Sequence, residues 1–360
     1  MSATEVPTAE PTEPTGPTGP TKTTEPTALP RPVWGRHLVI LAVVTVLLIP
    51  LPLLLPPATQ AVAVRVLIFA TMAIGWNVMS GFGGMFSFGH AAYFGLGAYT
   101  SVLLLVNFGI SPWIGLLAGM VVAASFGLLV GFLALRYRLK GAYFALSTFA
   151  FAEMLRLLAN NSDFVNRAVG YNVPLRPQSS LAFMQFTPGS PAYFWIALGL
   201  TVAAIAASIL FLRSRLGRFT IAVRDDEDAA AAVGVPVMRT KLLTIALSAA
   251  ITSVAGTFYT QYYFFVDPDI AFGSSVSIQA ILPAVIGGVA TIWGPAIGAM
   301  VLGPLNDITA TLLRNPPAAL SFLQGRAGLD VIVYALLLIL IVLLLPQGVY
   351  GAIRERVRRR

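Results

Sequence analysis

The sequence has no cysteine and little charge, and both shortages limit what the protein can be. The absence of cysteine excludes disulfides and Cys-ligated metal sites. There are only two histidines, His37 and His90, which excludes a His-rich zinc site. Charged residues make up 11% of the chain, whereas soluble domains contain about 25%. Apolar residues reach 57%, more than a soluble chain of 360 residues could hide in its cores. The composition therefore indicates a membrane protein.

The positive charge is distributed as in a membrane protein. The net charge is +8, but Arg and Lys stand in short clusters between apolar runs and do not cover one face. The clusters precede residue 38, occupy 136–140 and 213–241, and end the chain at 354–360. We therefore expect a lipid bilayer as the surrounding medium and no nucleic-acid partner.

Ten apolar runs of spanning length follow a polar tail. Residues 1–34 are rich in Thr, Pro, Glu and Gly and have almost nothing to bury, so we expect a disordered tail. The runs lie at 38–55, 61–80, 88–107, 112–135, 141–158, 191–212, 242–263, 277–291, 295–313 and 329–346. If all four basic clusters are cytoplasmic, the intervals between them hold four, two and four runs.

This pattern predicts an all-α, polytopic membrane protein of about ten transmembrane helices. The transmembrane domain covers 35–348, and both the 1–34 tail and the basic 349–360 tail are cytoplasmic. The eighth and ninth runs are short and are split at Trp293-Gly294-Pro295. We expect the protein in the plasma membrane.

The connector at 214–241 is the most charged segment between runs. Its four acids precede Ala229 to Ala232, which is typical of a helix start, and Gly234 and Pro236 then stop the helix. The residues assigned to it are Asp225, Asp226, Glu227, Asp228, Ala229, Ala230 and Gly234. This short cytoplasmic helix is either a solvated loop helix or a contact for a separate motor. The sequence has no nucleotide-binding loop, so ATP would be bound by partner subunits, and we expect no cofactor on this chain.

The same connector carries a resemblance to a known family. Asp228-Ala229-Ala230-x-x-x-Gly234 resembles the Glu-Ala-Ala-x-x-x-Gly coupling motif of ATP-binding-cassette importer permeases, with Asp in place of Glu. The segments 77–100, 141–156, 217–241 and 287–298 resemble, in the same order, the branched-chain amino-acid permease family, in particular its LivM-type subunit. The likeness runs from about residue 60 to residue 345.

The resemblance implies a permease subunit that imports branched-chain amino acids. It implies a second homologous permease subunit, two cytosolic ATPase subunits and an external solute-binding protein that docks on the loops 159–190 and 264–275. Urea and short-amide permeases are close relatives in this family. A secondary transporter coupled to ions is the alternative from another class.

Glycines interrupt the apolar sequence between the second and third runs. The six are Gly81, Gly83, Gly84, Gly89, Gly95 and Gly97. They either let helices pack closely or mark a broken segment that lines a cavity, and we favour the second. Ser87, Gly89 and His90 begin the third run, so we expect free backbone N–H groups there to face a solute carboxylate. His90 is equally compatible with a buried residue paired to a carbonyl.

Glu153 is the clearest charge inside an apolar run. Arg156 follows it by one turn, which favours an internal ion pair near the outer end of the fifth run, with a gate or solute contact as the alternative. Asp307 in the ninth run is similarly ambiguous. The candidate translocation path is therefore Ser87, Gly89, His90 and Glu153. With no nucleophile–base pair or metal cluster at helical spacing, we expect a transport subunit without a catalytic site.

Overall fold

The computed structural model describes residues 34–351 except 177, 188, 315–328 and 345–347, and they belong to one compact unit. The predicted tail at 1–34 lies outside the described residues apart from Trp34, which begins the first helix. The predicted tail at 349–360 lies outside them after residue 351.

Helices make up nearly all of the described structure. The long helices are α1 (Trp34–Leu48), α3 (Pro57–Trp76), α4 (His90–Phe108), α5 (Pro112–Arg136), α6 (Gly141–Asn161), α7 (Pro191–Arg213), α10 (Val237–Tyr263), α12 (Ser274–Gly287), α13 (Gly294–Arg314) and α14 (Leu329–Leu344). The short elements are α2 (Leu51–Leu54), α8 (Arg215–Asp225), α9 (Glu227–Ala232), α11 (Pro268–Phe272), a π turn (Asn77–Phe82), three 3₁₀ turns (Asp163–Val165, Arg167–Val169 and Leu181–Phe183) and strands β1 (Tyr171–Asn172) and β2 (Phe265–Val266).

The helices confirm a multi-pass membrane protein. Among the described residues, eight helical segments are long and apolar enough to cross a bilayer, and they overlap the first eight predicted runs. Helices α13 and α14 lie at the last two predicted runs, and the total of ten spans stays a prediction. The outer faces of α1, α5 and α6 expose large apolar side chains, such as Val46, Val121 and Leu158, which is the arrangement that lipid favours.

Two predicted boundaries differ from the structure, and one helix was not predicted. The first run is interrupted by a turn at 49–50, where Pro50 lacks the N–H that would continue α1. The eighth run ends at Gly287 and not at 291, because the chain turns through 288–293 before α13 begins. The split that we predicted near Trp293 is therefore real. The connector holds a helix that the sequence reading missed, α8, which precedes the predicted one.

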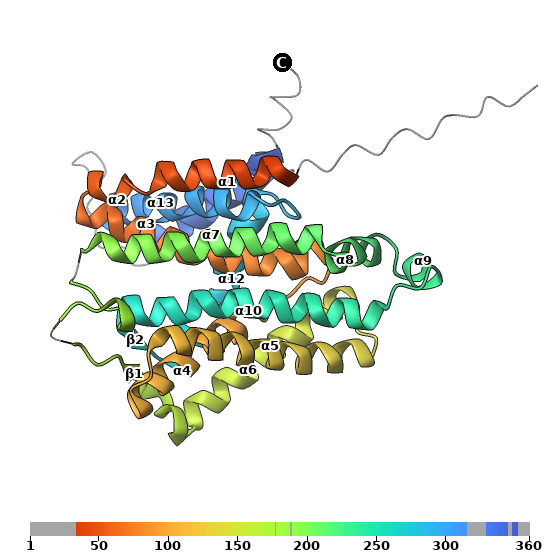
Figure 1. The fold of residues 1–360 in the computed structure, drawn as a ribbon, viewed down its shortest axis with the longest axis horizontal. Helices are drawn as coiled ribbons and strands as arrows, with labels where there is room; N and C mark the ends of the chain where they lie inside the picture. Colours follow the sequence, from red (N-terminus) through yellow and green to blue (C-terminus); the bar gives the residue numbers. More distant parts are fainter. Residues whose placement is uncertain (1–33, 177, 188, 315–328, 345–347, 352–360) are drawn as a thin grey trace, which may run out of the picture. The chain divides into compact units, whose positions relative to one another are not determined.

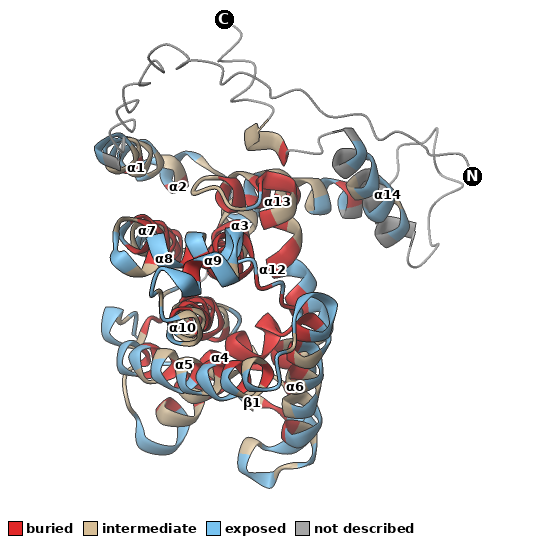
Figure 2. Cartoon of the chain, turned by 90° about the vertical axis from the view of Figure 1, so that its right-hand side faces the viewer, coloured by how far each residue is buried: buried red, intermediate tan, exposed pale blue. Residues whose placement is uncertain are grey.

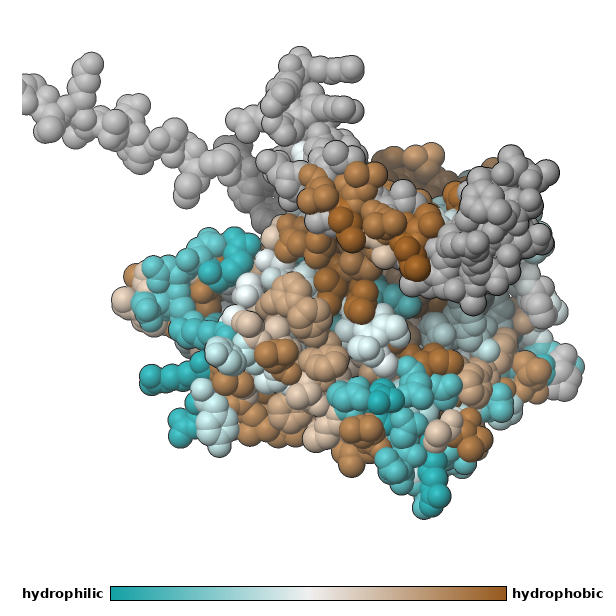
Figure 3. Space-filling view, turned by 180° about the vertical axis from the view of Figure 1, so that it is seen from behind, coloured by the Kyte–Doolittle hydropathy of each residue, from teal (hydrophilic) through white to brown (hydrophobic). Residues whose placement is uncertain are grey.

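Helices α7 and α10 run between two ends of the unit (Figure 1). Helices α8 and α9 lie at one end, called the α9 end, and strands β1 and β2 lie at the other, called the β1 end. Seen from behind, hydrophilic residues gather toward both ends, with more hydrophobic surface between them (Figure 3). The strands pair antiparallel, with Tyr171 opposite Val266, so the loops after α6 and after α10 are joined.

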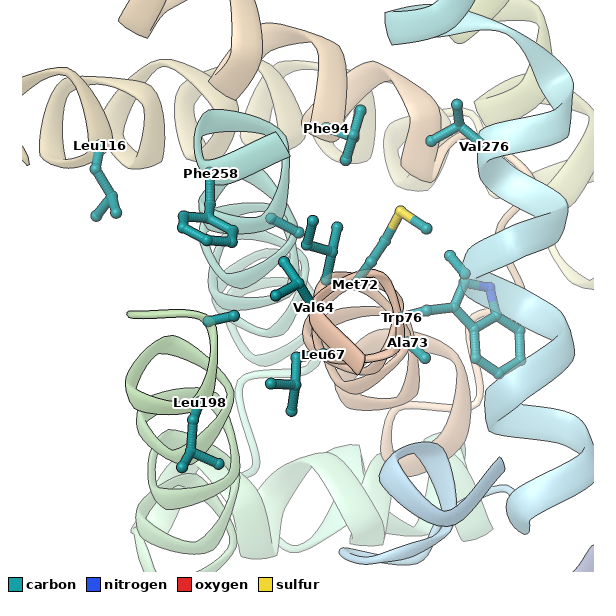
Figure 4. Close-up of a cluster of buried hydrophobic side chains, with 14 of the residues drawn as sticks. Val64, Leu67, Met72, Ala73, Trp76, Phe94, Leu116, Leu198, Phe258 and Val276 are labelled. Atoms are coloured by element: carbon teal, nitrogen blue, oxygen red, sulfur yellow. The ribbon is translucent and has the colours of Figure 1, made fainter. Parts of the chain in front are cut away.

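The core surrounds α3 and α10, which are mostly buried when the helices are viewed end-on (Figure 2). Side chains of α3 point outward in several directions: Leu67 toward Leu198 of α7, and Met72 toward Phe94 of α4 and Val276 of α12 (Figure 4). Helices α4 and α10 approach so closely that a β carbon on Gly256 would overlap the carbonyl oxygen of Phe94. Small residues at this contact let two membrane helices bring their backbones together.

We predict that Gly256→Ala destabilises the protein by about 1–3 kcal/mol, the usual cost of overpacking a close contact. Gly199→Ala is the matched control, because Gly199 lies in α7 and a β carbon there would have no neighbour within 4 Å. The control should keep or raise stability by up to about 1 kcal/mol through helix propensity. Thermal denaturation in detergent compares the two, and equal losses would contradict the close α4–α10 contact.

Candidate functional site

The predicted break lies between α3 and α4. Helix α3 passes into the π turn, and the chain then has no helix from 83 to 89 before α4 begins at His90. The side chain of Asn77 stabilises the break: its Oδ1 accepts from the Ala290 N–H (2.8 Å) and its Nδ2 donates to the Thr291 carbonyl (2.9 Å). The irregular backbone is thus joined to the turn between α12 and α13, and π turns are frequent at functional sites.

His90 lies fully buried at the start of α4, with partners on both ring nitrogens. Its Nε2 is 3.0 Å from Ser248 Oγ in α10, and its Nδ1 is 3.2 Å from Ser87 Oγ. Ser248 Oγ donates its own proton to the Gly75 carbonyl (2.6 Å), so Nε2 of His90 carries the proton that Ser248 accepts. Ser87 Oγ then donates to Nδ1, which describes a neutral imidazole whose hydrogen bonds are all made.

The expectation of free N–H groups at the start of α4 is wrong. The Ala91 N–H donates to Ser277 Oγ of α12 (3.0 Å), and the Gly89 N–H donates to Ser87 Oγ (3.1 Å). These hydroxyls occupy the positions that we assigned to a solute carboxylate. The start of α4 is buried inside the protein, so protein side chains satisfy its N–H groups.

We call Ser87, Gly89, His90, Ser248 and Ser277 the His90 node. It joins four helices, because the Trp76 indole N–H of α3 also donates to the Ser87 carbonyl (2.9 Å). The sequence reading found the first three residues and missed Ser248 and Ser277. A signal for Ser248 was available: Ser or Thr recurs every fourth residue at 240, 244, 248 and 252 of an otherwise apolar helix.

The charges inside the helices lie elsewhere. Glu153 pairs with Arg156 (Nε–Oε1 3.0 Å), as predicted, and Arg156 also pairs with Asp269 of α11, which we did not predict. Neither hydrogen-bond partner of His90 is Glu153, so the structure does not join the predicted path residues into one cluster. Asp307 of α13 pairs with Arg65 of α3 at 2.7 Å. Whether the path residues touch solute stays a prediction.

The predicted connector helix is α9, and it starts and stops where the sequence indicated. Asp226 caps it, with Oδ1 accepting from the N–H groups of Asp228 (3.0 Å) and Ala229 (2.9 Å). Gly234 follows it with φ +87°, a conformation that favours glycine. Asp225 was assigned wrongly, because it ends α8 and pairs with Arg224 (2.8 Å).

Helix α9 is tied to two other elements through Glu227. Its carboxylate lies 2.8 Å from Lys241 Nζ at the start of α10 and 3.3 Å from Lys140 Nζ before α6. Burial alone would raise the pKa of Glu227, but the two lysines outweigh it and hold that pKa below its usual value. Ala230 is buried, whereas Asp228 and Ala229 are exposed.

The buried polar node and the anchored helix α9 thus belong to a polytopic helical membrane protein. A family model described as the permease component of the branched-chain amino acid transport system matches residues 58–345. The chain belongs to this family. No solved structure matches it.

Named relatives agree with this assignment. The chain is 28% identical over 284 residues to the high-affinity branched-chain amino acid transport system permease protein LivM of Escherichia coli (strain K12), covering 73% of the chain and 66% of LivM. It is 28% identical over 297 residues to LivH of Salmonella typhimurium, covering 79% and 91%. It is 26% identical over 246 residues to the L-arabinose transport system permease protein AraH of Escherichia coli, covering 66% and 70%. The LivM matches, at 66% and 63%, span less than two thirds of those proteins.

We predict that Ser248→Ala destabilises the protein by about 1–3 kcal/mol, because the buried Nε2–H of His90 loses its acceptor. Ser253→Ala is the matched control: Ser253 is equally buried in α10, but its hydroxyl donates only to the Ala250 carbonyl of the same helix. The control should change stability by less than about 0.5 kcal/mol. Chemical denaturation in detergent measures both, and similar losses would contradict the hydrogen bonds of the His90 node.

Proposed function

We propose that this protein is the membrane permease subunit of an ATP-binding-cassette importer for branched-chain amino acids. The observation that carries the proposal is α9, a capped helix that is anchored by Glu227 and exposed at one end of a membrane-spanning bundle. The relatives LivM and LivH, named as permeases for branched-chain amino acids, support the solute class. ATP is hydrolysed by two cytosolic ATPase subunits that press on α9, and a second homologous permease completes the pore.

In this proposal the α9 end faces the cytoplasm and the β1 end faces outward. Val233, directly after α9, is 81% exposed and offers an apolar side chain to a partner at the α9 end. At the β1 end, the loop between α6 and α7 also exposes apolar side chains, including Phe164, Leu175 and Leu181. Val233 is therefore assigned to the ATPase contact, and the outward loop to docking of a solute-binding protein.

Contacts from the connector lead to the His90 node. Thr220 Oγ1 of α8 lies 2.8 Å from Thr244 Oγ1 of α10, and Ser248 of the node is one turn further along α10. A second contact reaches the helix break, since a β carbon on Gly84 would lie 2.6 Å from Cγ of Arg224. Movement of α8 and α9 is therefore transmitted to α10 and to the segment before α4, where it switches the path between its two openings.

The solute is the least constrained part of the proposal. AraH is named for L-arabinose, although it resembles this chain nearly as closely as LivM does. Specificity is therefore assigned mainly to the external binding protein. Urea or a short amide is the alternative solute, and ion-coupled transport through Glu153 is the alternative mechanism.

The proposal is tested by uptake of radiolabelled leucine into vesicles that contain the chain, the second permease and the solute-binding protein, with and without the ATPase subunits. We expect uptake only when both the ATPases and ATP are present. Uptake that persists without any ATPase subunit would overturn the proposal and favour ion coupling. Uptake of urea in place of leucine in the same vesicles would change the assigned solute and leave the assignment as an ATP-driven importer intact.

We predict that Val233→Asp abolishes copurification of the ATPase subunits and leaves the chain folded in the membrane, because an exposed apolar contact is replaced by a charge. Leu181→Asp is the control: it makes the same change at a side chain that is 63% exposed at the β1 end. The control should keep the ATPase subunits bound. If the ATPase subunits still copurify with Val233→Asp, the assignment of α9 to the ATPase contact is wrong.

We predict that Thr244→Val uncouples the importer, lowering uptake per ATP hydrolysed about fivefold without loss of stability. The two hydroxyls have two protons for three contacts, so one threonine donates to the other, which donates to a carbonyl of its own helix. Valine at 244 removes the α8–α10 link, while Thr220 can still donate to the Leu216 carbonyl, so the fold survives. Thr201→Val is the control, because Thr201 makes the same kind of contact with Thr71, 3.0 Å away, between α7 and α3. If Thr244→Val leaves the uptake per ATP hydrolysed unchanged, the Thr220–Thr244 hydrogen bond has no part in coupling.

A further inference from the structure

Gln261, near the β1 end of α10, is fully buried and makes no side-chain hydrogen bond. Neither its Nε2 nor its Oε1 has a partner among the residues that the structure describes. An amide that is buried without partners is expensive anywhere in a protein. Such a group calls for an explanation in terms of function.

The rest of α10 makes Gln261 an exception. The hydroxyls of six other residues on this helix each donate a hydrogen bond: Thr244, Ser248, Thr252, Ser253, Thr257 and Thr260. Most of them donate to a carbonyl of their own helix, which a hydroxyl does readily. The glutamine amide is larger, has two donors and two acceptor positions, and leaves all of them unused in this conformation.

A second unpartnered group lies at the same level, on α4. Contacts between α4 and α10 run in parallel, from Ser248 with His90 to Thr257, which donates to the Gly97 carbonyl (3.0 Å). One further turn along both helices brings Gln261 level with Ser101. Ser101 is fully buried and its Oγ also lacks a partner.

Helix α5 closes this region with a glycine. A β carbon on Gly115 would lie 2.8 Å from Ser101 Oγ, so α5 covers the hydroxyl without offering it a polar group. Leu105, one turn after Ser101 on α4, and Leu116, next to Gly115 on α5, are buried and aliphatic. The side chains of Gln261 and Ser101 are therefore buried near aliphatic residues without a hydrogen-bond partner.

We propose that Gln261 and Ser101 form a polar contact site for the transported solute, which is exposed when the β1 ends of α4, α5 and α10 move apart. The inference rests on the proposed function and adds a solute contact to it. The His90 node holds the start of α4 against the middle of α10 and supplies a pivot. Toward the β1 end the two helices touch through Gly97 and Gly256, and one cross-helix hydrogen bond, from Thr257 to the Gly97 carbonyl, breaks when they separate.

The chemistry of the site fits a small solute with adjacent N–H donors and oxygen acceptors. Oε1 of Gln261 accepts from an ammonium or amide N–H, and Nε2 donates to a carboxylate or carbonyl oxygen. An amino-acid zwitterion and urea share this pattern. Only the amino acid also places an aliphatic side chain beside Leu105 and Leu116, so we assign the site to a branched-chain amino acid.

The first test uses the purified chain alone and does not depend on transport. Gln261→Met keeps the length of the side chain and removes the unpaired amide, so the melting temperature should equal or exceed that of the wild type. A fall as large as that of Ser248→Ala would mean that the amide has a partner in the resting protein. That result would overturn the inference.

The second test measures radiolabelled leucine uptake by the complete importer in vesicles. Gln261→Met should reduce uptake about tenfold, the effect of one lost hydrogen bond to a charged group. Thr252→Val is the control, because its hydroxyl donates only within α10. No uptake by the wild type would contradict the proposed function. If Gln261→Met leaves leucine uptake at the wild-type level, the solute site is overturned and the proposed function stands. If the variant loses only urea uptake, the assignment of the site to an amino acid is overturned.

The third test uses the absence of cysteine from the sequence. Gln261→Cys introduces a single thiol, which should react slowly at rest, faster when the importer hydrolyses ATP, and slowly again when leucine is added. Ala249→Cys is the control for a permanently buried position on the same helix. A thiol at 261 that stays unreactive throughout the cycle would overturn the opening that the inference requires.

Discussion

The structure depends on one constraint: inside a bilayer, every backbone polar group must find its partner within the protein. A continuous helix meets this constraint unaided, but a broken one does not. The break between α3 and α4 is therefore possible only because side chains replace the missing helical bonds. Asn77 bonds to the turn before α13, while Ser87 and Ser277 take the first N–H groups of α4. These residues make the break a fixed part of the fold.

The same constraint explains the polar side chains of α10. Most of its hydroxyls bond to the backbone of their own helix or of a neighbour, so they cost little and bring the helices close together. At Ser248 the arrangement becomes a network, since one hydroxyl serves both the Gly75 carbonyl and His90. Helix α10 lies at the centre of the bundle and also contacts α8 of the connector through Thr244. Structural support and transmission of movement therefore share the same residues.

Much of the architecture could be predicted from the sequence, because spanning runs and helix caps are local signals. The apolar runs located eight membrane-crossing segments, and the acids before Ala229 located the start of α9. Helix α8 was missed because it is short, has four charged residues among its eleven and lies outside the apolar runs. The Glu153–Arg156 pair was predictable from one-turn spacing, whereas the addition of Asp269 was not.

The candidate site was harder to predict than the fold. Burial of His90 and occupation of the α4 start depend on Ser248 and Ser277, which are distant in sequence and meet only after three helices have packed. Spacing along one helix indicates that a hydroxyl is buried, but it does not indicate which backbone atom on another helix the hydroxyl will meet. The expectation of free N–H groups was wrong for this reason.

The pairing of β1 with β2 also has a consequence for biosynthesis. Strand β1 leaves the ribosome long before its partner, because α7, α8, α9 and α10 lie between them in the chain. The loop that contains Tyr171 therefore cannot reach its final form until α10 is in place. Arg156 likewise waits for Asp269. This end of the molecule is completed late, because a chain that ends before β2 lacks both the partner of β1 and the Asp269 that pairs with Arg156.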